Sequence, residues 1–300
     1  MKVDAILLSI VSLLSMKKFK FAVGSTAILC MALAIYFVLK SDYALLTHPK
    51  GIMARRELEL IRTNLLLMLL VVGPALLLFY GIAWKHRAQN SKAKYDPEHT
   101  QGKWKDIVLW CIPLIAIIPM AIITIYETHR LDPYRPIESD KKPLEIQVVA
   151  IDWKWLFIYP EEQIATVNFL QIPEQTPIHF HLAADGSPMN SFWIPQLSGQ
   201  IYAMAGMSTT LHLMADEPGE YTGRAAEING DGFADMTFLV KSTTQSEFDE
   251  WVKTVQGSSE PLTEEVYAEL LKPSMKVPII LYSHVENGFY HKILMKYMMH

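Results

Sequence analysis

The chain has 300 residues, of which 51% are hydrophobic, and a formal net charge of −4 at pH 7. Proteins that bind nucleic acid carry clustered positive charge, so this balance gives no support to that class. Both cysteines, Cys30 and Cys111, lie in long apolar runs, which excludes a disulfide framework and a thiolate metal site in the polar remainder.

Three long apolar runs occupy the first part of the chain, at residues 21–39, 65–84 and 107–126. Each has about the 20 residues that a helix needs to cross the hydrocarbon core of a membrane. Prolines in the second and third runs are compatible with membrane helices, whose neighbours satisfy the freed carbonyl groups. We therefore predict a transmembrane helical hairpin within residues 41–127, in preference to buried helices of a globular enzyme.

The first run, within residues 1–40, is either a cleaved signal peptide or an uncleaved signal anchor, and the anchor is favoured. Lys17 and Lys18 precede it, as basic residues precede the apolar core of secretory signals. Lipid attachment at Cys30 is disfavoured, because Leu29 stands before it where a small residue is expected.

The loop between the second and third runs sets the expected orientation. Residues 85–106 include five lysines and one arginine, and short loops rich in these residues stay in the cytoplasm. Everything after Tyr126 then lies outside. The sequence thus predicts a multi-pass membrane protein whose large C-terminal domain lies outside the cytoplasm, which for a bacterial inner (plasma) membrane is the periplasm.

Residues 128–242 have the pattern of an all-β sandwich, in which short apolar strands are separated by Gly, Pro, Asp and Asn. His179 and His181 alternate with apolar residues and are expected to face solvent, as is His212. No third ligand is evident beside the His-x-His pair, so no metal site is predicted there. Examples of the expected strands are Glu145–Ile151, Lys154–Tyr159, Thr166–Ile172, Pro177–Leu182, Thr209–Met214 and Met236–Val240.

Residues 243–300 are predicted to form an aromatic-rich helical C-terminal region. Thr244 and Glu247 make a capping-box pattern that opens a helix. A second helix is expected over residues 261–271. Apolar residues at helical spacing near the end of the chain predict a third helix, packed on the sandwich or on a neighbouring subunit.

Three stretches carry a resemblance to a known family: DWKWLFIYPE at 152–161, MNSFWIPQLSGQIYAMAGM at 189–207 and GRAAEINGDGFADM at 223–236. From about Leu46 onward, the chain resembles subunit II of the haem–copper quinol oxidases of the cytochrome bo type. The resemblance implies a cupredoxin-like sandwich, and a complex that oxidises quinol, reduces oxygen to water and pumps protons. It also implies that the haems, the copper and the quinol site belong to a partner, subunit I, which this chain supports and covers.

In the cytochrome c-oxidising relatives, the same sandwich carries a dinuclear copper centre. The resemblance places the two bridging cysteines of that centre at Ala225 and Asn229 and its two histidines at Asn190 and Phe233, while Met236 is retained. Such a centre needs thiolates and imidazoles, which a lone thioether cannot replace. We therefore expect no copper, no other cofactor and no catalytic residue in this chain, and no docking of cytochrome c.

Two carboxylates remain candidates for other roles. The resemblance places Asp106 at the mouth of a proton-uptake channel of subunit I, although an acidic residue there also stabilises a helix N-terminus. It places Glu227 at the interface with subunit I, as a hydrogen-bonding or a metal-binding group. The glycines at 223, 230 and 232 are expected to adopt positive φ in tight turns.

Two other functions stay open on the sequence. A stand-alone, membrane-anchored cupredoxin-like binding protein shares the architecture but purifies without a haem-bearing partner. A copper-bearing cytochrome c oxidase subunit II needs the missing ligands and is disfavoured. Trp153, which matches an aromatic residue near the electron-entry surface of copper-bearing relatives, and Trp155 are expected to be packing residues.

Overall fold

The computed structural model describes residues 17–40, 45–92, 102–187, 189–258 and 260–298. The predictions for residues 1–16, and the part of the orientation argument that rests on residues 93–101, lie outside this part of the chain.

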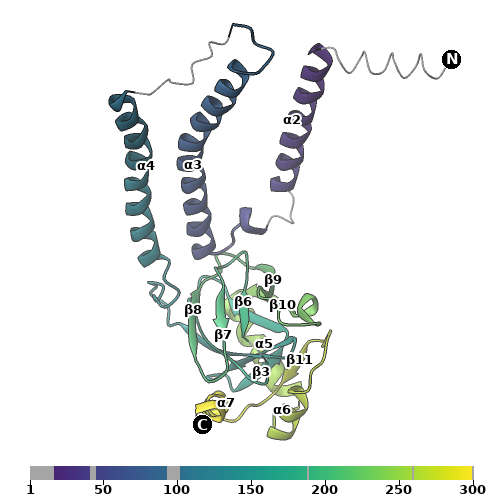
Figure 1. Cartoon of the computed structure of the whole chain (residues 1–300). Coiled ribbons are helices and arrows are strands. Elements are labelled where there is room, and N and C mark those ends of the chain that lie inside the picture. The colour runs from purple at the N-terminus through teal and green to yellow at the C-terminus, as the bar shows by residue number, and fades with distance from the viewer. Residues whose placement is uncertain (1–16, 41–44, 93–101, 188, 259, 299–300) are drawn as a thin grey trace, which may run out of the picture. The chain divides into compact units, whose positions relative to one another are not determined.

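The chain forms two compact units, residues 1–48 and residues 49–300. The first unit contains helix α2 (Lys17–Lys40) and the 3₁₀ turn η1 (Leu45–Thr47) (Figure 1). The second contains all the remaining helices and strands described below.

The second unit begins with two long helices, α3 (Ile52–Lys85) and α4 (Lys103–Arg130). Both are long and apolar enough to cross a membrane, and they contain the predicted spans 65–84 and 107–126. Each helix extends beyond its apolar run. α3 starts early because residues 52–64 are rich in Arg, Glu and Leu, which are good helix formers, and include no Gly or Pro.

The start of α3 is attached to the sandwich. Gly51 forms a β-bridge with Ala215, and the Ala54 N–H donates to the Leu197 carbonyl at 3.2 Å. A Cβ at Gly51 would lie 2.7 Å from the Leu197 oxygen and 2.8 Å from the Met214 oxygen. Only glycine allows the backbone at residue 51 to approach the backbones of Leu197 and Met214 this closely. Because Gly51 directly precedes the first residue of α3, the helix begins at the surface of the sandwich.

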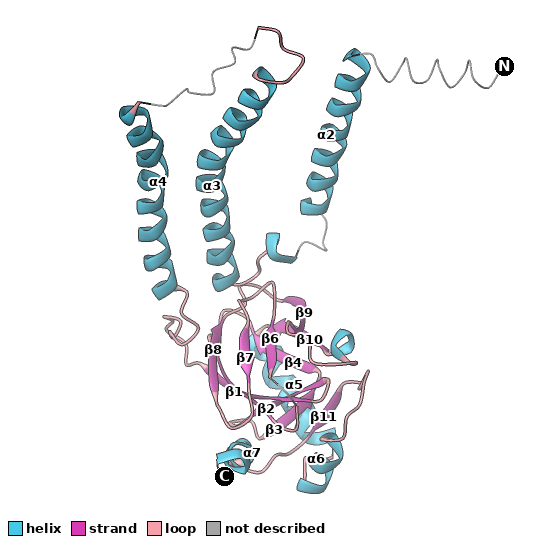
Figure 2. Ribbon diagram, in the orientation of Figure 1, coloured by secondary structure: helices cyan, strands magenta, loops and turns pink. Residues whose placement is uncertain are grey.

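The predicted β-sandwich is confirmed as two packed sheets (Figure 2). One sheet has six strands in the order β11–β3–β2–β1–β5–β8, and the other has five in the order β4–β10–β9–β6–β7. Most neighbours are antiparallel, but β1 pairs with β5, and β10 with β4, in parallel. The strands are β1 (Leu144–Ile151), β2 (Lys154–Tyr159), β3 (Ile164–Val167), β4 (Phe169–Pro173), β5 (Ile178–Ala184), β6 (Asn190–Trp193), β7 (Ile201–Ala203), β8 (Thr209–Leu213), β9 (Gly219–Ala225), β10 (Thr237–Thr243) and β11 (Ile280–Tyr282).

The main core lies between the two sheets and is rich in aromatic side chains. Buried Trp155 meets Phe192 and Phe238 edge-on, with ring centroids 5.2 and 5.9 Å apart. Edge-to-face pairs add to the stabilisation that burial provides. Along β5 the predicted alternation holds, because Phe180 and Leu182 are fully buried in this core. His179 and His181, which alternate with them, therefore lie on the other face of the six-stranded sheet.

One predicted strand proves to be two. The sequence predicts a single strand over Thr166–Ile172, whereas β3 and β4 belong to different sheets. The break is at Asn168, whose φ is +55°. Its side chain accepts from the Trp155 N–H and donates to the Val277 carbonyl, both at 2.9 Å. The backbone of Asn168 bonds to both sheets as well, since its N–H donates to the Trp155 carbonyl and its carbonyl accepts from the Leu239 N–H. The side-chain bonds add to these where the chain crosses between the sheets.

The residues after β10 cover the sandwich as helix α5 (Gln245–Ser258), helix α6 (Glu264–Leu270), strand β11 and helix α7 (Phe289–Met298). The predicted capping box is present, since the Thr244 N–H donates to Glu247 at 3.0 Å and the Glu247 N–H to Thr244 Oγ1 at 3.4 Å. Strand β11 departs from the all-helical prediction and pairs with β3 at the sheet edge. A second apolar cluster joins this tail to the sandwich, and its tail members include Leu262, Tyr267, Leu270, Tyr282, Phe289, Tyr290 and Ile293.

A buried carboxylate fastens the tail to the sandwich. Asp185 is 1% exposed and accepts hydrogen bonds from Tyr267 Oη at 2.8 Å, Lys296 Nζ at 2.7 Å and Tyr297 Oη at 2.6 Å. An isolated buried charge is costly, and these three donors compensate for it. The tail thus packs on the sandwich, the first of the two positions that the sequence predicts for it.

Candidate functional site

The loop of residues 223–236 joins β9 to β10 through the 3₁₀ turn η2 (Phe233–Asp235). Hydrogen bonds tie it down on both sides. The Ala225 N–H donates to the Met236 carbonyl at 3.0 Å, and the Ala226 N–H donates to the Ser191 carbonyl at 2.9 Å. Ala225 and Met236 are buried, so the loop is folded firmly against β6.

An amide network occupies the centre of this loop. Asn229 Nδ2 donates to Asn190 Oδ1 and, at 3.0 Å, to the sulfur of Met236. Asn190 Nδ2 donates in turn to Ser187 Oγ at 2.9 Å. Asn190 and Met236 are fully buried. Three of the five positions at which the resemblance places copper ligands therefore contact one another through neutral amide and thioether groups.

The other positions near the loop behave differently. Ala225 joins Met236 only through its backbone, and Phe233 is partly buried against the main core. Glu227 is exposed to solvent. The structure therefore brings Asn190, Asn229 and Met236 together, leaves Phe233 as a packing residue, and leaves Glu227 free to meet a partner.

Trp153 covers the loop. It occupies the turn between β1 and β2 with a φ of +58°, and its Nε1 donates to the Asn229 carbonyl at 3.3 Å. Gly230 has the predicted positive φ, +114°. The same prediction is wrong for Gly223 and Gly232, whose φ angles are not positive. These two positions need glycine for steric reasons, because a Cβ would overlap the ring of Phe238 at Gly223 and the ring of Trp153 at Gly232.

Asp106 lies in the first turn of α4 and is exposed. The N-cap residue is Gly102, which has no side chain to accept hydrogen bonds from the N–H groups of the first turn. A negative charge in this turn interacts favourably with the unpaired N–H groups of the helix end. The position is therefore compatible with both of the roles expected from the sequence.

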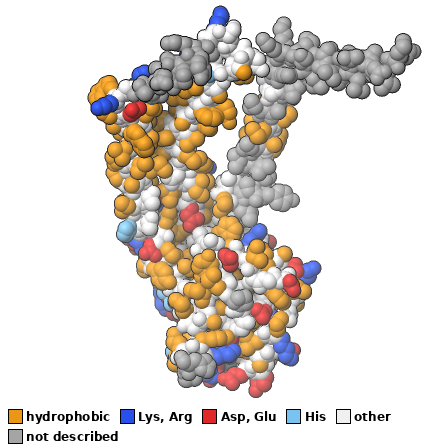
Figure 3. All heavy atoms as spheres, viewed as in Figure 1, with side chains coloured by type: hydrophobic (Ala, Val, Ile, Leu, Met, Phe, Trp, Pro, Cys, Tyr) orange, Lys and Arg blue, Asp and Glu red, His pale blue; other side chains and the backbone are white. Residues whose placement is uncertain are grey.

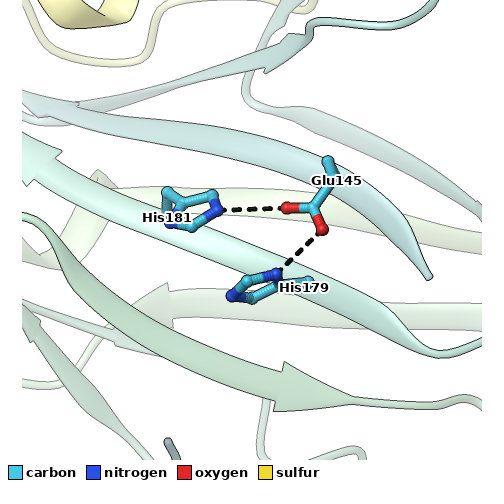
Figure 4. Close-up of side chains that lie close together, drawn as sticks. All are labelled: Glu145, His179 and His181. Carbon is cyan, nitrogen blue, oxygen red and sulfur yellow. Dashed lines mark hydrogen bonds and ion pairs between the residues drawn. The ribbon is translucent and has the colours of Figure 1, made fainter. Parts of the chain in front are cut away.

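A second polar group lies on the outer face of the six-stranded sheet. Glu145 of β1 pairs in register with His179 of β5. Its Oε1 lies 2.9 Å from His179 Nδ1 and its Oε2 lies 3.0 Å from His181 Nε2 (Figure 4). The expectation that no third group accompanies the His-x-His pair is therefore wrong. Glu145 is distant in the sequence and reaches the histidines only through the pairing of β1 with β5.

His212 of β8 extends this row, because it is the in-register partner of His179. It is 5% exposed, so the prediction that it faces solvent is wrong. Its ring stacks on that of His179, with centroids 4.3 Å apart. Burial, followed by the charge of the neighbouring His179, lowers the pKa of His212 to about 4. Alternation identifies the face on which a residue lies but not what covers that face, so no local pattern signals the burial of His212.

Two groups of exposed apolar side chains bear on function. The first group lines α3 and α4 over much of their length (Figure 3). The second group consists of Ile228 in the loop and Met189 before β6, which are 78% and 45% exposed and directly precede Asn229 and Asn190 respectively. Exposed apolar surface of this extent marks contact with a membrane or with another protein.

Comparison with known proteins assigns the chain to a family. Residues 256–300 match the family described as COX Aromatic Rich Motif. The chain is 46% identical over 252 residues to the cytochrome bo(3) ubiquinol oxidase subunit 2 of Pseudomonas putida. The matched region covers 84% of this chain and 80% of the relative. The chain belongs to the quinol oxidase subunit 2 family.

Another member of the quinol oxidase subunit 2 family, the ubiquinol oxidase subunit 2 of Acetobacter aceti, is 45% identical over 251 residues, covering 83% of this chain and 81% of its own. Among solved structures, the periplasmic domain of subunit II of cytochrome oxidase from Bradyrhizobium japonicum gives a TM-score of 0.37 at 20% identity, over 40% of this chain and 96% of that one. In this member of the quinol oxidase family, the aromatic-rich motif is the tail that contributes α6, β11 and α7.

Proposed function

We propose that this chain is subunit II of a respiratory quinol oxidase and that its loop 223–236 holds no electron-transfer centre. The complex oxidises quinol, reduces oxygen to water and pumps protons, and its haems and copper belong to subunit I. This chain is held in the inner membrane by α3 and α4, and its sandwich covers subunit I on the periplasmic side. Membership of the quinol oxidase subunit 2 family supports the proposal.

The observation that carries the second half of the proposal is the network of Asn190, Asn229 and Met236. Neutral amides and a thioether are poor substitutes for the thiolates and imidazoles of a dinuclear copper centre. The loop contains no Cys and no His. A water-soluble cytochrome needs an electron relay at the outer surface, whereas a lipid-soluble quinol reaches haems within the membrane directly. The loop is therefore kept for packing and for contact with subunit I.

Purification of the full chain through an affinity tag, from membranes of the source bacterium, tests this proposal. We expect a large haem-bearing subunit to co-purify, and the preparation to consume oxygen with a quinol but not with reduced cytochrome c. Recovery of the chain without any haem protein would favour a stand-alone binding protein. A mixed-valence dinuclear copper signal in the electron paramagnetic resonance spectrum would contradict the absence of a relay centre.

We further propose that Asp106 collects protons at the cytoplasmic mouth of an uptake channel in subunit I. Its exposure at the first turn of α4 supports this role. Asp106→Asn keeps the size and helix-start position of the side chain but removes its charge, so we expect slower quinol oxidation and less proton uptake in reconstituted vesicles. Wild-type turnover and pumping in this variant would leave Asp106 with only its effect on the helix end.

A further inference from the structure

We propose that Glu145, His179 and His181 form a binding site for a divalent first-row transition-metal ion, of which Zn²⁺ is the representative. The site lies on the outer face of the six-stranded sheet, on β1 and β5. It is separate from the loop 223–236, and it adds a function to the structural role proposed above. It would also revise the expectation that this chain holds no metal.

The geometry is that of a nearly assembled three-ligand site. One ligand atom from each of the three residues lies within 4.8 Å of the other two. The carboxylate oxygens already reach His179 Nδ1 and His181 Nε2 at 2.9 and 3.0 Å. Bonds of about 2.0–2.1 Å to a tetrahedral Zn²⁺ place ligand atoms about 3.3 Å apart. Because the three ligand atoms already lie within 4.8 Å of one another, rotations of the side chains on a fixed backbone suffice to admit the ion.

The chemistry of the ligands selects the class of ion. Two imidazole nitrogens and one carboxylate oxygen form the set that binds Zn²⁺ in sites with three protein ligands and an open fourth position. Imidazole also suits Cu²⁺ and Ni²⁺, whereas Mg²⁺ and Ca²⁺ prefer all-oxygen sites. The three side chains are 24–34% exposed, which gives an ion access and leaves room for a water ligand.

The surrounding sheet holds these ligands in place. β1 and β5 pair over seven residues, from Leu144–Ile178 to Ala150–Ala184, so the Cα positions of Glu145 and His179 are fixed. The ring of His212 stacks on that of His179 and limits its rotation. Ligands carried on strands and supported by neighbouring side chains are positioned more precisely than ligands on loops. The alternative is that the carboxylate only bridges two imidazoles by hydrogen bonds.

Zn²⁺ titration of the chelator-treated full chain in detergent, followed by isothermal calorimetry, separates these alternatives. We expect one ion per chain, no response to Mg²⁺, and a rise in the melting temperature with Zn²⁺. His179→Gln, His181→Gln and Glu145→Gln should each weaken Zn²⁺ binding at least tenfold, since even substitutions behind metal ligands cost about 10–100-fold. The matched control is His291→Gln, an exposed histidine on α7, which should bind Zn²⁺ as the wild type does.

A second readout does not depend on the stability of the variants. Cu²⁺ added to the wild-type chain should give a mononuclear spectrum with hyperfine coupling from two nitrogens, distinct from the dinuclear signal that would contradict the proposed function. Absence of stoichiometric Zn²⁺ binding by the wild type would overturn the site. Wild-type affinity in the His179→Gln/His181→Gln double variant, or loss of binding in His291→Gln, would overturn it as well.

Discussion

Asn229 illustrates at the scale of one residue how a metal-ligand position can be filled without a metal. Its amide group joins Asn190 to the sulfur of Met236, and its carbonyl accepts from Trp153. These bonds satisfy the amide nitrogen of Asn229, whereas its Oδ1 is buried without a hydrogen-bond partner among the described residues. An unpaired buried polar group costs about 1–3 kcal/mol, so the bonds that are formed matter for the stability of the loop. The loop thus keeps its shape through hydrogen bonds between neutral groups.

The network predicts that Asn190→Ala destabilises the sandwich. The change removes the bond to Ser187 and the acceptor for Asn229, and it leaves a small cavity at a fully buried position. We expect the free energy of unfolding to fall by about 1–3 kcal/mol, measured by chemical denaturation of the full chain in detergent.

Asn287→Ala is the control for this change. Asn287 is exposed, and its side chain accepts a single hydrogen bond from Gln163 at 3.3 Å. Its loss should change the unfolding free energy by no more than about 0.5 kcal/mol. Equal effects of the two substitutions would show that the buried network adds nothing to stability.

The limits of sequence reasoning are clearest at the histidines. Strand alternation correctly separates His179 and His181 from the buried Phe180. It cannot find Glu145, because the parallel pairing of β1 with β5 joins residues that are far apart in the chain. It also misses the burial of His212, which depends on packing around the sheet. Local pattern therefore predicts the face of a strand, and only the register of the sheet reveals the site.

Among the elements, those with a strong local signal are the ones that the sequence predicts. The apolar runs give the cores of α3 and α4, and the Thr244–Glu247 capping box gives the start of α5. The break at Asn168 and the short strand β11 were not predicted. Both depend on distant partners, Val277 and β3 respectively, which no local pattern contains.

The tail is predicted to detach at alkaline pH. Burial raises the pKa of Tyr290 to about 12 and also raises those of Tyr267 and Tyr297, whereas a tyrosine in an unfolded chain titrates near 10. The detached tail therefore loses protons first, so docking is stable below about pH 10 and weakens as the pH rises towards 12. The pKa of Lys296, raised mainly by its hydrogen bond to Asp185, acts in the same direction.

Tyrosinate absorbance and near-ultraviolet circular dichroism, followed together against pH, check this prediction. Tyr290→Phe removes one titrating group and the hydrogen bond to Ser208, so it should reduce the steepness of the transition. Titration of all the tyrosines near their ordinary value, with no loss of the dichroism signal, would contradict the expected coupling.

The junction between α3 and the sandwich makes a prediction of its own. Gly51→Ala would push a methyl group against the carbonyls of Leu197 and Met214, and overpacking of this kind costs about 1–3 kcal/mol. We expect a lower melting temperature for the full chain in detergent. Gly81→Ala, in the same polypeptide segment but with no atom within 4 Å of the added carbon, should leave the melting temperature unchanged or slightly raised.

For the whole molecule, the exposed apolar side chains indicate a chain that functions in contact with others. Ile228 lies in the loop directly after Glu227, and Met189 directly precedes Asn190, whose side chain accepts from Asn229 of the loop. We propose that this surface contacts subunit I. Ile228→Glu and Met189→Glu would place charges in that contact. We expect both to reduce the amount of haem-bearing subunit recovered with the tagged chain, while the isolated chain keeps its melting temperature.

Ile279→Glu is the control for this surface, because Ile279 is 48% exposed and lies in the tail, just before β11. It should leave co-purification unchanged. Full recovery of the haem-bearing subunit with both loop variants would show that subunit I does not contact this part of the chain. The fold class and the membrane spans follow from the sequence, whereas the contact surface depends on which side chains the packed sandwich leaves exposed.

Strand β11 closes the β3 edge of the six-stranded sheet, and the ribosome makes it after every other strand. Until nearly all of the polypeptide has been exported, that flank offers unpaired backbone groups to any extended segment nearby. If translation terminates before Ile280, the β3 edge stays unpaired permanently. Such shortened products should therefore aggregate or be degraded by quality-control proteases.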